Sequence, residues 1–279
     1  MKPSSDSAEQ RSKNSAVQDI ARGLVAARKR AQPLAELPGS IPDSLEEAYR
    51  IQDVAIDLRA DRIGGWKVGR IPLNLEEGFG IDRLAGPIFA NTIVQAESGT
   101  SCEMPIFAGG FGAIEAEFVA VIDRDAPPEK VTWSPEEALD MIADLRIGLE
   151  IASSPLADIN DLGPLVVVSD HGNNLGLIVG PSIDGWRTRS LESLKCSTFV
   201  EEEAVGAGGA FTLTDGFIRS VQFLLELSAR RNRPLRAGDM IATGQTTGIH
   251  DVKVGESGTV DFGDDGKLSV KLIAATPVA

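Results

Sequence analysis

Cysteine and histidine are scarce in this sequence, with two residues of each in 279. Neither Cys102 nor Cys196 lies in a C-x-x-C pattern, which favours reduced thiols in a cytoplasmic protein over a disulfide framework. An H-E-x-x-H pattern is also absent, so the sequence offers no ordinary zinc site.

Long apolar runs and basic residues are scarce as well. No uninterrupted apolar run approaches the ~20 residues that span a membrane. Residues 1–14 lack the apolar core of a secretory signal, and we expect them to form a flexible tail. The 27 basic residues are outnumbered by 41 acidic ones, for a net charge of −14. Nucleic acid and anionic membranes require a basic surface, so neither is expected as a partner. An anionic substrate would need local positive charge from a metal ion or from a particular lysine or arginine.

Three common catalytic patterns are missing. The sequence has no G-x-S-x-G motif, which excludes an ordinary serine hydrolase. It also has no G-x-x-x-x-G-K-[ST] phosphate-binding loop. The glycines at 110–112 and 206–209 do not complete a dinucleotide-binding fingerprint in a strand-turn-helix setting.

Apolar periodicity and capping residues predict helices near the N-terminus and mostly strands from residue 114 onwards. Predicted helices start at Ser15, at Ser44 (to about Leu58), at Ser134 (to about Ala143) and at Asp215 (to about Arg231). Predicted strands cover 114–122, 144–151, 166–168 and 175–179, with a hairpin over 258–262 and 268–273. Residues 64–69 are expected to form a short strand or turn, and residues 70–110 to be mostly irregular.

The expected fold class is therefore α+β. A helical and irregular part over 15–105 is followed by a strand-rich sheet roll or sandwich over 106–279. This division is also compatible with one continuous domain.

Two glutamates separated by one residue stand in I-E-A-E-F-V-A-V-I over 114–122. A β-strand places Ile114 and Phe118 on one face, and Glu115 and Glu117 on the other. Adjacent carboxylates on a partly apolar surface repel each other, and burying them is costly unless they share a proton or a cation. A divalent metal ion with oxygen ligands meets this need. An edge strand with both glutamates in water is the alternative.

Glu150 supplies a third carboxylate. It lies in D-L-R-I-G-L-E-I over 144–151, where Leu145 and Ile147 occupy one face and Glu150 the other. Three carboxylates on two strands predict a Mg²⁺ or Mn²⁺ site with coordination positions left for water or substrate.

Lys67 lies among three glycines in G-G-W-K-V-G. It is a candidate cation for a substrate carboxylate, with a surface lysine as the alternative. In S-D-H-G-N-N over 169–174, Asp170 adjoins His171, and histidine is a natural proton shuttle. The alternative for this segment is a capped loop of turn-forming residues.

The segment T-G-Q-T-T-G over 243–248 follows a short apolar strand. Its hydroxyls and amides are candidates for holding a substrate carboxylate.

Together these motifs resemble the hydratase/decarboxylase branch of the fumarylacetoacetate hydrolase superfamily, from about Glu46 to about Phe262. The resemblance rests on G-W-K-V-G (65–69), I-E-A-E-F (114–118), G-L-E-I (148–151), S-D-H-G-N-N-L-G (169–176), T-G-Q-T-T-G (243–248) and V-D-F-G (260–263). It implies a mixed β-sheet roll, a homo-oligomer and a Mg²⁺- or Mn²⁺-dependent lyase for small 2-oxo or 2-hydroxy-dienoic acids. The reaction it implies first is hydration of a 2-hydroxy-2,4-dienoate to a 4-hydroxy-2-oxo acid in aromatic catabolism. Decarboxylation of a 2-oxo acid of the 4-oxalocrotonate type, carbon–carbon hydrolysis of an acylpyruvate, and metal-containing binding without turnover are the alternatives.

The resemblance also implies roles for individual residues. The family's metal ligands correspond to Glu115, Glu117 and Glu150, and its substrate-binding lysine corresponds to Lys67. The family's loop aspartate corresponds to Asp170, and the threonine of its Gly/Thr loop corresponds to Thr247. The predicted catalytic residues are Lys67, Asp170 and His171, and the predicted substrate-binding residues are Lys67, Gln245 and Thr247. Three positions depart from the family pattern: Gly69-Arg70-Ile71-Pro72 replaces a G-L-T-S-like segment, Ala152 stands where aspartate is common, and His171 replaces an asparagine.

Overall fold

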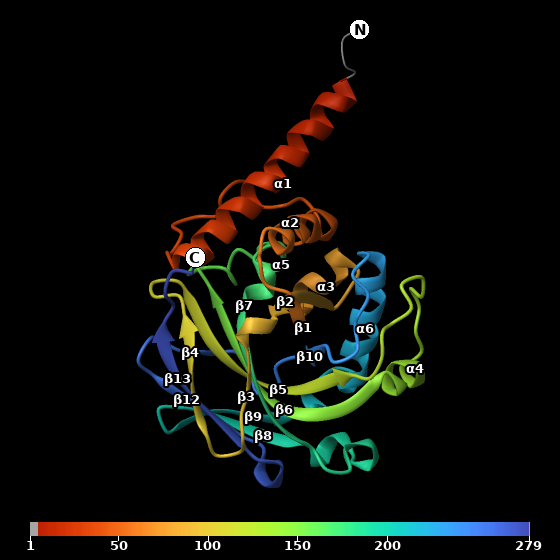
Figure 1. The fold of residues 1–279 in the computed structure, drawn as a ribbon, viewed down its shortest axis with the longest axis vertical. Coiled ribbons are helices and arrows are strands. Elements are labelled where there is room, and N and C mark those ends of the chain that lie inside the picture. The colour runs from red at the N-terminus through yellow and green to blue at the C-terminus, as the bar shows by residue number, and fades with distance from the viewer. Residues whose placement is uncertain (1–4, 279) are drawn as a thin grey trace.

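The computed structural model describes residues 5–278 and consists of two β-sheets with helices gathered around them (Figure 1). The α-helices are α1 (Ser5–Arg30), α2 (Leu45–Asp57), α3 (Leu73–Phe79), α4 (Pro135–Asp140), α5 (Pro164–Ser169) and α6 (Gly216–Arg230).

The larger sheet has eight strands in the order β2-β1-β10-β5-β6-β7-β3, with β11 paired to β5. Its strands are β1 (Ile63–Arg70), β2 (Arg83–Phe89), β3 (Ile93–Gln95), β5 (Phe111–Ile122), β6 (Ile142–Ser154), β7 (Asn174–Ser182), β10 (Met240–Ala242) and β11 (His250–Asp251). β5 and β6 form the long antiparallel pair at its centre, and β1 runs parallel to β10. Strands from both predicted parts of the chain therefore belong to one sheet.

The smaller sheet has five strands in the order β4-β13-β12-β8-β9. Its strands are β4 (Ser101–Ile106), β8 (Lys195–Val200), β9 (Glu203–Gly209), β12 (Ser257–Asp261) and β13 (Lys267–Ala274). β12 and β13 are antiparallel, which confirms the predicted hairpin. The apolar face of β5 packs against this sheet, where the rings of Phe118 and Phe262 meet edge to face at 5.4 Å. The predicted α+β fold with a mixed-sheet roll and a helical N-terminal part is confirmed.

Capping residues set the starts of several helices as predicted. The hydroxyl of Ser44 accepts a 3.2 Å hydrogen bond from the amide of Glu47. Ser134 and Glu137 form a complete capping box. α4 nevertheless ends at Asp140 rather than near Ala143, because β6 begins at Ile142. α6 follows the predicted apolar stripe, and its buried residues include Phe217, Val221, Leu224, Leu225 and Ser228.

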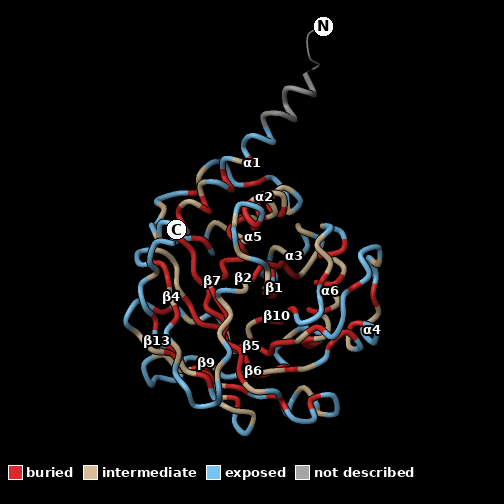
Figure 2. The backbone as a smooth tube through the Cα atoms, in the orientation of Figure 1, coloured by how far each residue is buried: buried red, intermediate tan, exposed pale blue. Residues whose placement is uncertain are grey.

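The first helix is longer than predicted. α1 begins at Ser5 rather than at the predicted cap Ser15, so residues 5–14 of the predicted tail are helical. Residues 1–4 lie outside the described residues. This end of α1 projects away from both sheets (Figure 1), whereas the later part packs on α2 through a buried face (Figure 2). That face consists of Val17, Ile20, Ala21, Leu24 and Val25.

Two other sequence-based expectations are wrong. Residues 166–168 form part of α5 rather than a strand, because Pro164 begins a helical turn after Gly163. Three valines alone do not distinguish a short strand from a short buried helix. Residues 70–110 contain α3, β2, β3 and β4 rather than mostly irregular chain. β2 escaped prediction because it is buried on both faces and so lacks the period-two alternation of an amphipathic strand.

Cys102 and Cys196 are both free, as predicted. Within the described part of the chain, no helix has the length and apolar character needed to cross a membrane.

Candidate metal centre and active site

The β5–β6 pair brings three glutamates together. Glu115 lies directly opposite Glu150, and Glu117 lies opposite Gly148. A Cβ atom at position 148 would lie 2.4 Å from Cγ2 of Val119, so glycine is needed where the two strands approach. One carboxylate oxygen of each glutamate lies within 4.8 Å of the others. All three side chains are buried, so the solvated edge strand is wrong.

Each of these glutamates leaves one buried oxygen without a hydrogen-bond partner, namely Glu115 Oε1, Glu117 Oε1 and Glu150 Oε2. Other contacts fix the carboxylates in place. Glu117 Oε2 accepts a 2.6 Å hydrogen bond from the amide of Gly244, and Glu150 Oε1 accepts one of 3.0 Å from Nδ2 of Asn174. Unpartnered buried carboxylate oxygens are costly, and a cluster of three buried carboxylates offers the oxygen ligands that a hard divalent cation takes. The donor set therefore fits such a cation.

In the metal-free cluster the pKa values of Glu115 and Glu117 are raised. Burial raises the pKa of Glu115 to about 7, against the opposing charge of Lys67, and the charge of Glu150 adds to the rise. Burial, together with the charges of Glu150 and Glu115, raises the pKa of Glu117 well above its usual range. A cation that binds here must displace protons, so its affinity is expected to increase with pH.

Lys67 borders the glutamate cluster. Its Nζ lies 3.3 Å from Glu150 Oε1 and donates a 3.4 Å hydrogen bond to Oδ1 of Asn173. Burial lowers the pKa of Lys67, but the three glutamates outweigh burial and raise it above the ordinary value. The ammonium group therefore stays charged. The alternative of a surface lysine is wrong, since Lys67 is only 4% exposed.

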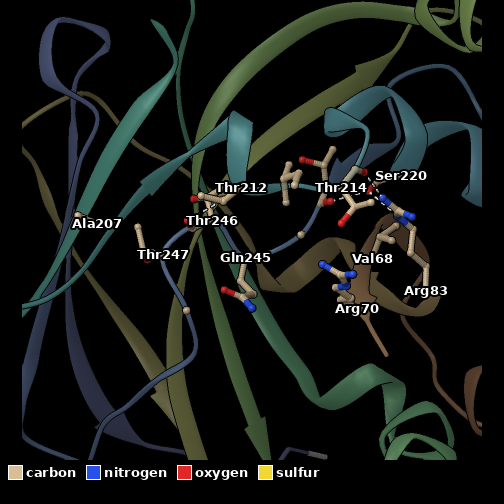
Figure 3. A pocket seen from close by; sticks show the side chains of 15 residues that line it. Val68, Arg70, Arg83, Ala207, Thr212, Thr214, Ser220, Gln245, Thr246 and Thr247 are labelled. Carbon is tan, nitrogen blue, oxygen red and sulfur yellow. Dashed lines mark hydrogen bonds between the residues drawn. The ribbon is translucent and has the colours of Figure 1, made fainter. Parts of the chain in front are cut away.

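One cavity borders this cluster, and a second is lined by Gly244, whose amide binds Glu117. The first, of about 220 Å³, is lined by Lys67 and Glu115 along with residues of β1, α5 and two loops. The second, of about 320 Å³, lies beside the 243–248 loop (Figure 3). Gly69, Arg70 and Gln245 line both cavities. The two cavities therefore share part of their lining.

The carboxylate of Asp170 forms a buried ion pair rather than lining a cavity. Its Oδ1 lies 2.5 Å from Nε of Arg28, and its Oδ2 accepts a 2.6 Å hydrogen bond from the hydroxyl of Ser154. Arg28 also donates to the carbonyl oxygens of Ser153 and Asn174. α1 is thus fastened to the 169–174 loop, and the catalytic role of Asp170 stays a prediction.

The ring of His171 packs edge to face on Phe89, with centroids 5.3 Å apart. Both ring nitrogens are buried without a hydrogen-bond partner, and His171 is not among the residues that line the two cavities. Burial, with the charges of Arg28 and Arg59, lowers its pKa well below the ordinary value. The imidazole is therefore neutral near pH 7, and its catalytic role also stays a prediction.

Asn173 and Asn174 are the members of this loop whose side chains touch the site, through Lys67 and Glu150. From the sequence, these asparagines were expected only to form a turn. Two consecutive amide side chains directly before a buried strand were the available signal.

The two predicted substrate-binding residues of the 243–248 loop lie at the cavities. Gln245 lines both cavities and Thr247 lines the second. The hydroxyl of Thr247 shares a 2.7 Å hydrogen bond with that of Thr198 and lies 3.2 Å from Nε2 of His250. Their role in binding substrate stays a prediction.

Comparison with known proteins decides the family. A model of the fumarylacetoacetate (FAA) hydrolase C-terminal domain matches residues 89–275. The chain belongs to the fumarylacetoacetate hydrolase family. The matched segment contains the three glutamates and the 243–248 loop, and it begins after Lys67. The predicted family is confirmed.

Curated relatives in the family support the hydratase/decarboxylase branch. 2-Keto-4-pentenoate hydratase of Paraburkholderia xenovorans (strain LB400) is 27% identical over 245 residues, covering 86% of this chain and 88% of that protein. 2-Keto-4-pentenoate hydratase 2 of Dechloromonas aromatica (strain RCB) is 25% identical over 260 residues, covering 88% and 93%.

Solved structures share the fold. 4-Oxalocrotonate decarboxylase from Pseudomonas putida G7, complexed with magnesium and adipate, has a TM-score of 0.77 at 21% identity, covering 93% of this chain and 98% of that one. Fumarylpyruvate hydrolase from Pseudomonas aeruginosa, in complex with Mn²⁺ and pyruvate, has a TM-score of 0.56 at 19% identity, covering 77% and 91%.

Proposed function

We propose that this family member is a divalent-metal-dependent lyase that hydrates a 2-hydroxy-2,4-dienoate to a 4-hydroxy-2-oxo acid in aromatic catabolism. The observation that carries the proposal is the cluster of three buried glutamates, each with an unpartnered oxygen, with a charged Lys67 beside them at a cavity. The hydratase names of the curated relatives support the reaction. The magnesium and manganese of the related structures support Mg²⁺ or Mn²⁺ as the ion.

The charges of the site suit an anionic substrate. Three ionised glutamates and one divalent cation leave one negative charge in excess, which Lys67 balances. Lys67 would hold the substrate's carboxylate, with Gln245 and Thr247 orienting the remainder of the molecule. When bound, the cation would supply Lewis-acid stabilisation of negative charge at the substrate's 2-oxygen.

Asp170 and His171 are proposed to affect the reaction through their loop. Asp170 fixes the loop by binding Arg28, and the loop's Asn173 and Asn174 contact Lys67 and Glu150. Displacing the loop would therefore shift Lys67, whose ammonium group meets the substrate, and Glu150, which is one of the metal ligands.

Decarboxylation is the second candidate reaction, because the fold matches that of 4-oxalocrotonate decarboxylase over nearly its whole length. Hydrolysis of an acylpyruvate, as in the fumarylpyruvate hydrolase neighbour, and binding without turnover are further candidates. We also propose a cytoplasmic location, a homo-oligomer, and no nucleic-acid or membrane partner.

Freshly generated 2-hydroxypenta-2,4-dienoate provides the test. Formation of 4-hydroxy-2-oxopentanoate that stops with EDTA and returns with Mn²⁺ would support the proposal. Release of CO₂ from a 2-oxo dicarboxylate, or carbon–carbon cleavage of an acylpyruvate, would instead support the alternative enzymes. Binding of 2-oxo acids with no turnover of any of these substrates would support a binding protein.

A further inference from the structure

The second cavity differs in charge from the chain as a whole. Its lining contains two arginines, Arg70 and Arg83, and no acidic residue, in a chain of net charge −14. The other polar side chains of the lining are hydroxyls and the amide of Gln245. Figure 3 shows Arg70 and Gln245 in the middle of this lining, with a group of threonines on one side and Arg83 on the other. Such a cavity suits an anionic group.

Arg70 has donors to spare. Its Nε lies 3.1 Å from Glu76 Oε1, and this is its one polar partner among residues 5–278, so both terminal nitrogens are left for a ligand. Arg83, by contrast, is engaged by the carboxylate of Asp82 and the carbonyl oxygen of Thr214. Arg70 is therefore the arginine able to meet a ligand directly, while Arg83 adds positive charge behind it.

The second cavity shares part of its lining with the cavity where the 2-oxo acid is proposed to bind. Lys67 and Arg70 lie on the same strand, β1. At ~3.3 Å per residue their Cα atoms are about 10 Å apart. Gly69, Arg70 and Gln245 line both cavities. Side chains three positions apart on a strand point to opposite faces, so Lys67 and Arg70 can share a ligand only at the end of β1, where Arg70 lines the first cavity together with Lys67.

We propose that the second cavity binds a distal carboxylate of the substrate through Arg70, with Gln245 beside it. The protein then prefers 2-oxo or 2-hydroxy-dienoic dicarboxylates to monocarboxylates. This inference rests on the proposed function, which places the 2-oxo acid end at the glutamates and Lys67. Arg70 belongs to the segment 69–72 that departs from the family pattern, so the preference is a property of this chain.

Calorimetric binding of 2-oxohexanedioate and 2-oxohexanoate to the Mn²⁺-loaded full-length protein tests the proposal. The two ligands differ only in a carboxylate or a methyl group at the far end. The wild-type protein is expected to bind the dicarboxylate about tenfold or more tightly, the scale of a charge-assisted hydrogen bond. Arg70→Gln should bring this ratio close to one and leave 2-oxohexanoate affinity unchanged. Glu76→Gln should increase the ratio, because it removes the carboxylate that competes for Arg70.

Arg236→Gln is the matched control, because Arg236 is an exposed arginine paired with Asp125 away from both cavities. It should leave the ratio unchanged. Equal affinities in the wild-type protein would overturn the distal site while the proposed function stands. Binding of neither ligand to the Mn²⁺-loaded protein would overturn both proposals. A dicarboxylate preference that survives Arg70→Gln would also overturn the assignment of Arg70 as the residue that binds the distal carboxylate. Glu76→Gln tests the same assignment without altering Arg70, so the test does not depend on how well Arg70→Gln folds.

Discussion

Replacing Glu115 with glutamine should stabilise the metal-free protein and at the same time remove most of its stabilisation by metal. Glutamine preserves the shape of the side chain but does not ionise. The buried Glu115 has a pKa of about 7 in place of the ordinary 4.5. At 1.36 kcal/mol per pKa unit, ionising it in the folded protein costs about 3 kcal/mol more than in the unfolded chain.

The direction of the pH dependence follows from the raised pKa. Between about pH 4.5 and pH 7 the folded state holds more protons on Glu115 than the unfolded state, so the stability of the wild-type protein falls as pH rises through this window. The variant should therefore match the wild type below about pH 4.5 and exceed it by up to about 3 kcal/mol above pH 7. At about 2–4 °C per kcal/mol, Tm should increase by roughly 6–12 °C.

Bound Mn²⁺ should stabilise the wild-type protein more than the Glu115→Gln variant. At a Mn²⁺ concentration of about 100 Kd, the wild-type protein gains about 2.7 kcal/mol. Loss of even an outer contact to a metal site weakens affinity by about 10–100-fold, and loss of a ligand should reach the upper end of this range. The variant would then gain only about 0.4 kcal/mol at the same concentration.

Thermal unfolding at about pH 5 and pH 8, with EDTA or with Mn²⁺, measures both effects. Glu77→Gln removes an exposed carboxylate on α3 and should change neither quantity. The reasoning is refuted if the metal-free Glu115→Gln protein is less stable than wild type at pH 8, or if Mn²⁺ stabilises it as much as the wild type.

Four further outcomes are expected. Lys67→Met should reduce kcat/KM at least about hundredfold, and unchanged kinetics would contradict the proposed role of Lys67. The affinity for Mn²⁺ at high pH should not fall in this variant, because the ammonium group repels the metal ion. Calorimetry should show Mn²⁺ affinity increasing as pH rises through about 7, where Glu115 loses its proton; a constant affinity would contradict the proton competition. Arg28→Met leaves Asp170 buried and unpaired, so chemical denaturation should show a free energy of unfolding lower by about 3–5 kcal/mol. A variant as stable as the wild type would argue against the buried ion pair. His171→Asn should cost modest activity with a nearly unchanged pH profile, whereas a loss of about hundredfold would make it a proton-transfer residue.

The glutamate cluster was predictable because its information is local. The period-two alternation in 114–122 and 144–151 placed each glutamate on the face opposite the apolar residues, and the structure has the same faces. The pairing of Glu115 with Glu150 could not be predicted from the sequence of either strand, because strand register depends on tertiary contacts.

Contacts between distant parts of the chain account for what the sequence did not reveal. Lys67 reaches the cluster because β1 pairs with β10, which is formed by residues near the C-terminus. Arg28 and Asp170 are separated by 142 positions, and nothing in the pattern around Asp170 indicates an arginine partner. Periodicity also failed where burial is two-sided, as in β2, and where the apolar run is too short to distinguish a strand from a helix, as in α5.

The metal site is tested most directly by locating the ion itself. Crystals of the protein with Mn²⁺, measured at the manganese absorption edge, should show an anomalous peak bounded by carboxylate oxygens of Glu115, Glu117 and Glu150. Ligand distances of about 2.0–2.6 Å are expected for a hard cation with oxygen ligands, and the peak should disappear in Glu115→Gln. A fully occupied manganese held by other residues, with no peak among these three oxygens, would contradict the proposed metal centre.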